Sequence, residues 1–345
     1  MSDLSTLPKA QLHVHLESAV RWSTLRELGA ANGVPVPEHL ADPAYRLEGF
    51  ADFFAQRKLV LACLRRPEDF YRVACEFCQD QAADGVRHVE VSFTAAAHGE
   101  RLGDPEMPLR AVLDGLAAGS EASRSKASRS AAGGGAGSAA GALSYGVILD
   151  HSRRRPVERA WQTLELAVRH RDAGVIGIGL AGDEAYPLAP FGEVCRAARD
   201  AGLRNLHHAG EAAGPDSVRE ALTVGLADRI GHGINAIADP SLVAELRDRG
   251  IALEVCPSSN IALGFAGSYA EHPLPRLRDA GLAVSLHTDI PSLIHTTLTS
   301  EYGAVRDAYG WSGATLAELA TASVDASFAD AATKARIRSE IADWL

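Results

Sequence analysis

Long apolar runs and an excess of positive charge are both missing from this sequence. Its 345 residues include 34 lysines and arginines against 44 aspartates and glutamates, which gives a formal net charge of −10. A nucleic-acid surface needs clustered Lys and Arg to displace counterions, and anionic membranes attract the same side chains. The charge therefore argues against both kinds of partner and leaves a small molecule as the expected ligand.

Signals for secretion are missing as well. No apolar run approaches the length that crosses a bilayer, and the first residues do not form a signal peptide. The cysteines are few and widely spaced, at Cys63, Cys75, Cys78, Cys195 and Cys256. An odd number at such spacings is typical of free thiols in a reducing compartment, and packing is favoured over a redox role for the lone C-x-x-C at 75–78. We therefore expect a cytoplasmic protein.

What is present is a repeating pattern of strands and helices. Short apolar runs alternate with longer amphipathic stretches, which is the rhythm of βα units. The runs predict strands at residues 11–16, 86–93, 143–149, 175–180, 203–207, 229–230, 251–255 and 282–286. The stretches between them predict helices at 156–171, 190–201, 217–225, 240–249 and 273–280. This pattern favours one (β/α)8 TIM barrel, a single α/β domain over residues 1–345, rather than an open doubly wound sheet.

Two regions interrupt the pattern. Residues 21–70 are helical in character with several prolines, and we expect them to form additional helices inserted after the first strand. Residues 119–141 are of low complexity, rich in Ser, Ala and Gly, and their glycine-rich half has almost nothing to bury. We predict a flexible surface loop within the barrel domain at 119–141.

Polar residues gather at the ends of the predicted strands, where barrel enzymes carry their chemistry. Four strand ends supply them, with His13 and His15, His207 and His208, His232, and finally His287 and Asp289. Side chains two apart on a strand face the same way, so the first pair points into the barrel mouth. Each histidine alone is more often a hydrogen-bonded barrel residue, but their coincidence on one rim indicates a site for zinc or another borderline first-row metal.

Glu211 follows His208 by three residues. A carboxyl group that is shielded from water near a metal can hold a proton near neutral pH and act in general acid–base catalysis. The alternative is an acid in the first turn of a helix, where the helix dipole favours it. The residue alone favours that alternative, so its catalytic role depends on the neighbouring histidines.

Six segments extend the pattern over nearly the whole chain outside 119–141. They are KAQLHVHLE at 9–17, GLAGDE at 179–184, HAGE at 208–211, IGHG at 230–233, LEVCPSSN at 253–260 and SLHTDIP at 285–291. In this order they resemble the motifs of the adenosine deaminase family within the amidohydrolase superfamily. The resemblance implies a zinc-dependent hydrolytic deaminase of an aminopurine nucleoside or a related amino-heterocycle.

The same resemblance implies roles for particular residues. One zinc ion per chain would be held by His13, His15, His208 and Asp289. Glu211 would donate a proton to the purine ring nitrogen, and His232 would orient the attacking water and help to deprotonate it. Gly182 would contact the base through its backbone, and Glu17 would lie near the sugar hydroxyl.

The segment that reads the base departs from the family. The family usually carries two successive aspartates after the last strand, and the second bonds to the imidazole nitrogen of the purine. Ile290 takes that second place here and cannot make the bond. His287 stands where asparagine is common, and Ser18 where glycine usually follows the acidic residue. A site built around a hydrogen bond discriminates strongly against ligands that lack it, so these changes bear on the substrate.

Several functions therefore stay open at this point. One is deamination of adenosine, and another is deamination of a different substrate such as 6-aminodeoxyfutalosine, free adenine or an N6-modified purine, which Ile290 and His287 favour. A third is a binding relative that has lost turnover, and a fourth is a metal hydrolase that cuts an amide or ester. The proton donor expected at Glu211 argues against the last two. The sequence does not determine the oligomeric state.

Overall fold

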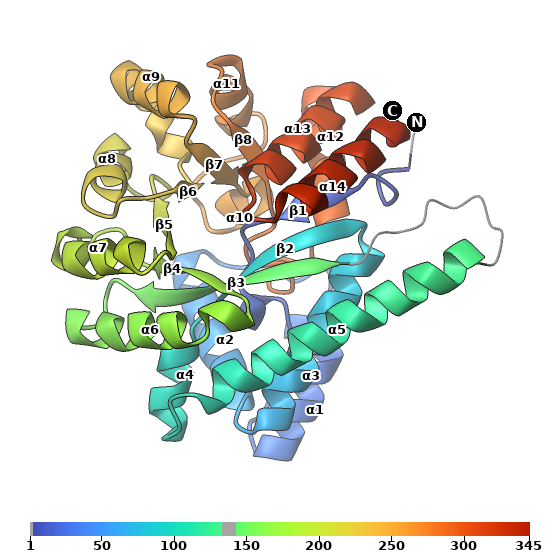
Figure 1. Cartoon of the computed structure of the whole chain (residues 1–345), viewed down its shortest axis with the longest axis vertical. Helices are drawn as coiled ribbons and strands as arrows, with labels where there is room; N and C mark the ends of the chain where they lie inside the picture. Colours follow the sequence, from blue (N-terminus) through green and yellow to red (C-terminus); the bar gives the residue numbers. More distant parts are fainter. Residues whose placement is uncertain (1–2, 133–142) are drawn as a thin grey trace.

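The computed structural model describes residues 3–132 and 143–345. Eight parallel strands form one sheet in chain order and curve into a nearly closed barrel with helices around it (Figure 1). The strands are β1 (Lys9–Gln11), β2 (Val86–Phe93), β3 (Ser144–Ser152), β4 (Val175–Ala181), β5 (Arg204–Ala209), β6 (Arg229–His232), β7 (Ala252–Val255) and β8 (Val284–Leu286). The predicted TIM barrel is confirmed.

Near the carboxyl ends of the strands, the first strand contacts its neighbours by irregular pairing. β1 comprises Lys9–Gln11, with an irregularity in its pairing between Lys9 and Ala10, so it begins two residues before the predicted 11–16 and ends at Gln11. Beyond it, Val14 forms an isolated parallel bridge with Asp289, and His15 forms one with Ser92. The backbone N–H of Asp289 donates to the carbonyl of His13, which joins the first and last strand ends.

The helices fall into an outer ring and an inserted group. The inserted helices predicted at 21–70 are present as α1 (Trp22–Asn32) and α2 (Phe50–Cys63), and a third inserted helix, α3 (Pro67–Ala83), begins at the end of that range. Next come α4 (Ala95–Leu102), α5 (Met107–Ala132), α6 (Val157–Arg169), α7 (Gly192–Asp200), α8 (Pro215–Thr223) and α9 (Pro240–Arg249). The last are α10 (Pro257–Ala262), α11 (Leu274–Asp279), α12 (Leu298–Tyr309), α13 (Gly313–Ala326) and α14 (Ala331–Trp344). Among the described residues, no helix has both the length and the apolar character needed to cross a membrane.

The low-complexity segment differs from the prediction. The flexible loop expected at 119–141 is helical in its first part, because α5 continues to Ala132. Small residues allow this helix to lie close against α3. A Cβ at Gly115 would be 2.4 Å from the carbonyl of Tyr71, and one at Gly119 would be 2.6 Å from Cys78 Cβ. Alanine also has the highest helix propensity, so the Ala-rich composition supports a packed helix here. The remainder of that prediction, 133–142, lies outside the described residues.

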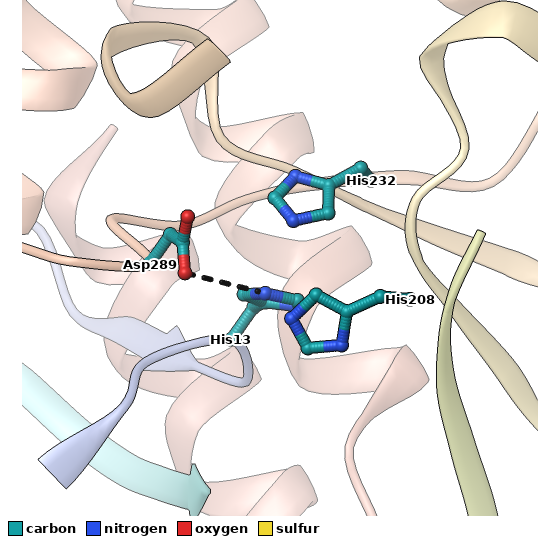
Figure 2. A group of neighbouring side chains, drawn as sticks. All are labelled: His13, His208, His232 and Asp289. Carbon is teal, nitrogen blue, oxygen red and sulfur yellow. Dashed lines mark ion pairs between the residues drawn. The ribbon is translucent and has the colours of Figure 1, made fainter. Parts of the chain in front are cut away.

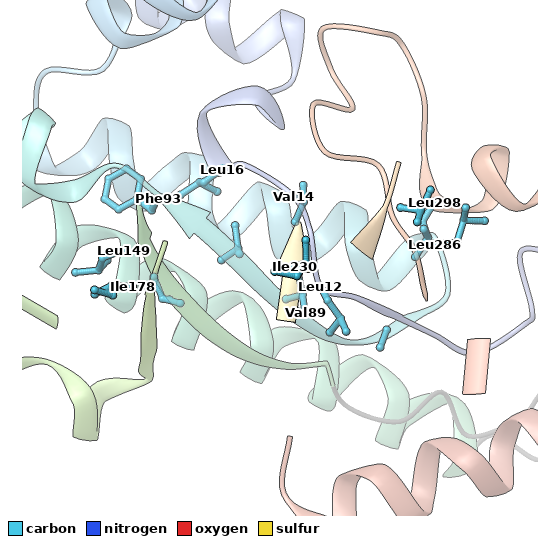
Figure 3. Close-up of a cluster of buried hydrophobic side chains, with 14 of the residues drawn as sticks. Leu12, Val14, Leu16, Val89, Phe93, Leu149, Ile178, Ile230, Leu286 and Leu298 are labelled. Carbon is cyan, nitrogen blue, oxygen red and sulfur yellow. The ribbon is translucent and has the colours of Figure 1, made fainter. Parts of the chain in front are cut away.

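The barrel interior contains both apolar and charged side chains. Leu12, Val89 and Ile230 lie in the apolar core (Figure 3). Beside this core, Arg229 is 2% exposed and pairs with two buried carboxylates, Glu90 and Glu254, each at 2.5 Å. Removing one partner from such a buried group leaves an uncompensated charge. The ion pairs therefore hold Glu254 in place under the rim.

Candidate metal and substrate site

Four side chains that the sequence singled out converge on the rim. His13, His208, His232 and Asp289 each offer a ligand atom, and these atoms all lie within 4.8 Å of one another (Figure 2). They come from the ends of β1, β5, β6 and β8 respectively, so strands far apart in sequence meet at one point. The predicted convergence of these strand ends is present in the structure.

His15 approaches the same point from the side. Its Nε2 lies 3.1 Å from His208 Nε2 and 3.3 Å from Asp289 Oδ1, and the same carboxylate oxygen lies 3.7 Å from His13 Nε2. Ligand atoms on one tetrahedral zinc, each about 2.0–2.1 Å from the metal, are about 3.4 Å apart. The spacing around Asp289 therefore matches a metal centre, with His15 and His232 as rival fourth ligands.

The ring nitrogens around this point fit a metal ion. His13 Nε2 and His232 Nε2, which face this point, are buried and find no hydrogen-bond partner within the part of the chain that the structure describes. Buried polar atoms are nearly always satisfied in folded proteins, so these orphaned imidazole nitrogens need an explanation. A divalent cation bound by His and Asp side chains would satisfy His13 Nε2.

Two of these candidate ligands are held by groups to which the sequence analysis assigned no role. His13 Nδ1 lies 2.8 Å from Glu254 Oε2, and Ser259 Oγ donates to Asp289 Oδ2 at 2.6 Å. Such outer contacts orient the ligand and set the tautomer of a metal-binding histidine. The segment LEVCPSSN contains both Glu254 and Ser259, so the signal was present in the sequence but its function was not visible there.

The backbone is strained at two of the candidate ligands. His232 has φ 64° and Asp289 has φ 61°, in the left-handed region that residues other than glycine seldom adopt. Such conformations cost about 1–3 kcal/mol and cluster at functional sites. The strain fits a functional site, where the direction of a side chain is kept at the cost of an unfavourable backbone conformation.

Glu211 lies in the wall of the cavity next to the candidate ligands. Asn260 Nδ2 donates to Glu211 Oε1 at 2.8 Å, and the same carboxylate oxygen is 3.4 Å from His232 Nδ1. Burial raises the pKa of Glu211 well above its usual value, and the negative charges of Asp289 and Glu184 raise it further. A carboxyl group in this setting can carry a proton at neutral pH and act as a general acid.

The loop that carries Glu211 is fixed by another carboxylate. Glu184 accepts the backbone N–H groups of Gly210, Glu211 and Ala212 at 2.7–2.8 Å. These bonds set the position of the backbone from which the Glu211 side chain extends. Glu184 belongs to the GLAGDE segment, whose glycine and not its acid had been assigned a role.

A cavity opens beside these groups. Its empty volume is about 670 Å³ including its mouth. One wall is aromatic and comes from Phe50, Phe53 and Phe54 of α2, an inserted helix. Gly182 lines the cavity with φ 93°, and a Cβ there would lie 3.2 Å from Ser152 Oγ. This placement agrees with a backbone contact at Gly182.

The structure does not place the other three predicted substrate-binding residues in the cavity lining. Glu17 is 2% exposed and accepts the backbone N–H of Thr94, which does line the cavity. Ile290 is 1% exposed and packs with Leu263 in an apolar cluster behind the aromatic wall. Both can influence the substrate only through the residues that they support.

His287 and His207 are structural by their contacts. His287 is fully buried, its Nδ1 accepts the N–H of Leu12 at 3.0 Å, and its Nε2 is 2.8 Å from Ser285 Oγ. It therefore lies below the site, away from the cavity. His207 Nε2 donates to the carbonyl of Gly225 at 2.9 Å, on the opposite face of β5 from His208. Alternation along a strand explains why only one of two adjacent histidines reaches the rim.

Comparison with known proteins gives one consistent result. The adenosine deaminase family model matches residues 8–344. A putative adenosine/adenine deaminase of Streptomyces coelicolor is 34% identical, over 99% of this chain and 98% of its own. An aminodeoxyfutalosine deaminase of Streptomyces avermitilis is 35% identical, over 100% of this chain and 94% of its own. The crystal structure of an adenine deaminase from Arthrobacter aurescens superimposes with a TM-score of 0.86 at 28% identity, covering 98% of each chain. This chain therefore belongs to the adenosine deaminase family, whose members are hydrolases that act on C–N bonds.

Proposed function

We propose that this protein is a zinc-dependent hydrolytic deaminase of an aminopurine or a related amino-heterocycle, with one Zn²⁺ per chain bound by His13, His15, His208 and Asp289. The observation that carries the proposal is the convergence of these side chains with Glu211 beside one cavity. Each of the three histidines and the aspartate has an atom within 3.7 Å of another member of the set.

His232 is assigned to the reaction rather than to the metal. Its Nδ1 lies 3.2 Å from Asn260 Nδ2, which leaves Nε2 free toward the site. Burial lowers the pKa of His232 to about 3, and the positive charge of His13 acts in the same direction. A neutral imidazole at pH 7 can hydrogen-bond to water, and we assign to His232 the orientation of the attacking water and the uptake of its proton.

The chain's own residues then supply the remaining steps. When bound, zinc acts as a Lewis acid that lowers the pKa of a water molecule towards neutrality. Glu211 donates a proton to the ring nitrogen as water attacks the adjacent carbon that bears the amine. The amine leaves as ammonia, and the ring carbon keeps the oxygen of water. Gly182 contacts the heterocycle through its backbone.

The cavity wall bears on which heterocycle is bound. Phe50, Phe53 and Phe54 offer flat apolar surface, and Ile290 behind them supplies no hydrogen bond to an imidazole nitrogen. Because relatives of this chain include an adenine deaminase and an aminodeoxyfutalosine deaminase, we favour a substrate other than adenosine, with free adenine, 6-aminodeoxyfutalosine and N6-modified purines as the first candidates. Adenosine is the alternative, and a binding relative without turnover is a second alternative that the complete set of polar groups argues against.

The experiment is a substrate panel with the zinc-loaded, full-length protein. Adenosine, adenine, 6-aminodeoxyfutalosine and N6-methyl-AMP are incubated separately, while the ultraviolet spectrum and the released amine, ammonia or, from N6-methyl-AMP, methylamine, are followed. We expect loss of the amine from at least one substrate, with adenosine slower than the best. If adenosine is the fastest, the substrate part of the proposal is wrong. If no substrate reacts although zinc is bound, the binding relative becomes the better interpretation.

A further inference from the structure

Asp150 is a buried carboxylate that the proposed reaction does not use. It lies near the end of β3, is 3% exposed and borders the cavity. Its Oδ2 is 3.1 Å from His15 Nδ1, an ion-pair distance. Apart from this contact, neither of its carboxylate oxygens has a hydrogen-bond partner in the ranges 3–132 and 143–345. A buried carboxylate is costly unless it is paired, so the single contact with His15 is the interaction that compensates its burial.

The contact mirrors one on the other side of the site. His15 presents Nε2 to Asp289 and His208, and its remaining nitrogen faces Asp150. His13 presents Nε2 to Asp289, and its remaining nitrogen faces Glu254 at 2.8 Å. A carboxylate behind an imidazole fixes the ring orientation and raises its basicity as a ligand. The two histidines of the H-x-H segment therefore each have a carboxylate on the side away from Asp289.

The neighbouring strand leaves room for this carboxylate. Asp150 pairs in register with Gly179 of β4. A Cβ on Gly179 would lie 2.1 Å from Asp150 Oδ1, well inside van der Waals contact. Gly179 is not among the glycines with positive φ, so its backbone alone does not require glycine. The same Cβ would lie 2.9 Å from the backbone carbonyl oxygen of Leu206 on β5, so Asp150 and the neighbouring strand together leave no room for a side chain at 179.

From these contacts we infer that Asp150 is a positioning residue for His15, and that Gly179 leaves the space in which the Asp150 carboxylate lies. The inference rests on the proposed function, since it gives His15 the role of a zinc ligand. Asp150 therefore acts through its contact with His15.

The test measures zinc affinity, which is independent of turnover. The full-length protein and its Asp150→Asn and Asp150→Ala variants are titrated with a chromophoric chelator that competes for zinc. We expect both variants to bind zinc about 10- to 100-fold more weakly, the usual effect of losing an outer partner of a ligand. Melting temperatures of the zinc-free proteins report whether the variants fold.

A matched control is Asp69→Asn. Asp69 is also buried, at 1% exposed, but it accepts the backbone N–H groups of Arg65 and Arg66 at the start of α3, away from the cavity. This variant should lower the melting temperature and leave zinc affinity unchanged. Folded Asp150 variants that bind zinc as tightly as the natural chain would overturn the inference, while the proposed function would stand.

Two further variants test the route of the effect. In a His15→Ala background, Asp150→Ala should cause no further loss of zinc affinity, because the carboxylate has no imidazole left to orient. Gly179→Ala should weaken zinc binding more in the natural chain than in the Asp150→Ala background, where only its contact with the Leu206 carbonyl remains. Additive losses in the first pair, or unchanged affinity in folded Gly179→Ala, would contradict the inference. A natural chain that binds no zinc would overturn the proposed function itself.

Discussion

The rim of the barrel and the aromatic wall of the cavity are built differently. Rim side chains such as His13, His208 and Asp289 come from strand ends, and each is held by barrel hydrogen bonds or a buried partner. The wall comes from Phe50, Phe53 and Phe54 on α2, an inserted helix that is not part of the barrel sheet. Barrel strands share one hydrogen-bonded sheet, whereas an inserted helix can change without disturbing it. The difference indicates that reaction type resides in the rim and substrate choice in the wall.

The largest expected effect comes from breaking the rim at Asp289. Asp289→Ala removes the carboxylate that faces both His13 and His15. We expect zinc content to fall towards zero and deamination to reach background, because the three remaining imidazoles lose the only anionic member of the proposed set. Elemental analysis after dialysis and an ammonia assay measure the two effects. Asp248→Ala, on an exposed part of α9, serves as a control that should change neither.

The next effect separates proton transfer from metal binding within the rim. Glu211→Gln keeps an oxygen that can accept the bond from Asn260 but removes the proton that the carboxyl group donates. We expect kcat to fall by about 10²- to 10⁴-fold, the range for losing a general acid, with zinc near one per chain. Steady-state kinetics and elemental analysis check this. Full activity in this variant would contradict the mechanism.

A change in the wall should act on substrate binding rather than on chemistry. Phe53→Ala removes one aromatic face from the cavity. We expect KM to rise by about 10-fold with kcat nearly unchanged, since losing apolar contact in a pocket costs about 1–3 kcal/mol. The control Trp161→Ala, at a 40% exposed aromatic residue on α6, should leave KM as it is. A fall in kcat alone for Phe53→Ala would remove the proposed division between rim and wall.

The smallest effect concerns Glu301, a buried carboxyl group outside the proposed metal site, and the pH dependence of the protein's stability. Glu301 accepts the N–H of Ser258 at the start of α10, and burial raises its pKa from 4.5 to about 7. A carboxyl group whose pKa is raised by folding stabilises the protein below the unfolded pKa, and this stability is lost as pH rises through the folded pKa. The free energy of unfolding of Glu301→Gln, relative to that of the natural chain, should therefore rise by up to about 3 kcal/mol between pH 4.5 and 8. Urea unfolding of both proteins at pH 4.5 and at pH 8 measures this. The same stability difference between the variant and the natural chain at the two pH values would contradict the prediction.

Most of the barrel could be predicted from the sequence because its signals are local. Apolar runs marked all eight strands, and the predicted limits of β2, Val86–Phe93, agree with the structure. Irregular pairing shortened β1, since Val14 and His15 form only isolated bridges beyond it. The segment at 119–132 was misjudged because low complexity hides a helix whose small residues are needed for contact with α3.

The site could be predicted only in part for a similar reason. The rim residues were found because their strand ends meet in any closed parallel barrel. Glu254 and Asp150 were not found, because a carboxylate behind a histidine is defined by distance and leaves no spacing pattern. The predicted contact of Ile290 and His287 with the substrate stays a prediction, and the structure gives both of them buried neighbours instead.

The sequence by itself determined the strand order, the side chains at the strand ends and thereby the family and reaction class. These follow from periodicity and from residue types that carry metal and proton chemistry wherever the barrel brings them together. Only the tertiary structure decided which nitrogen of His13 and His15 faces Asp289, which carboxylate lies behind each ring, and which residues form the wall beside Glu211. Those choices depend on contacts between strands and helices that are distant in the chain, where a difference of about 1 Å separates a bond from a gap.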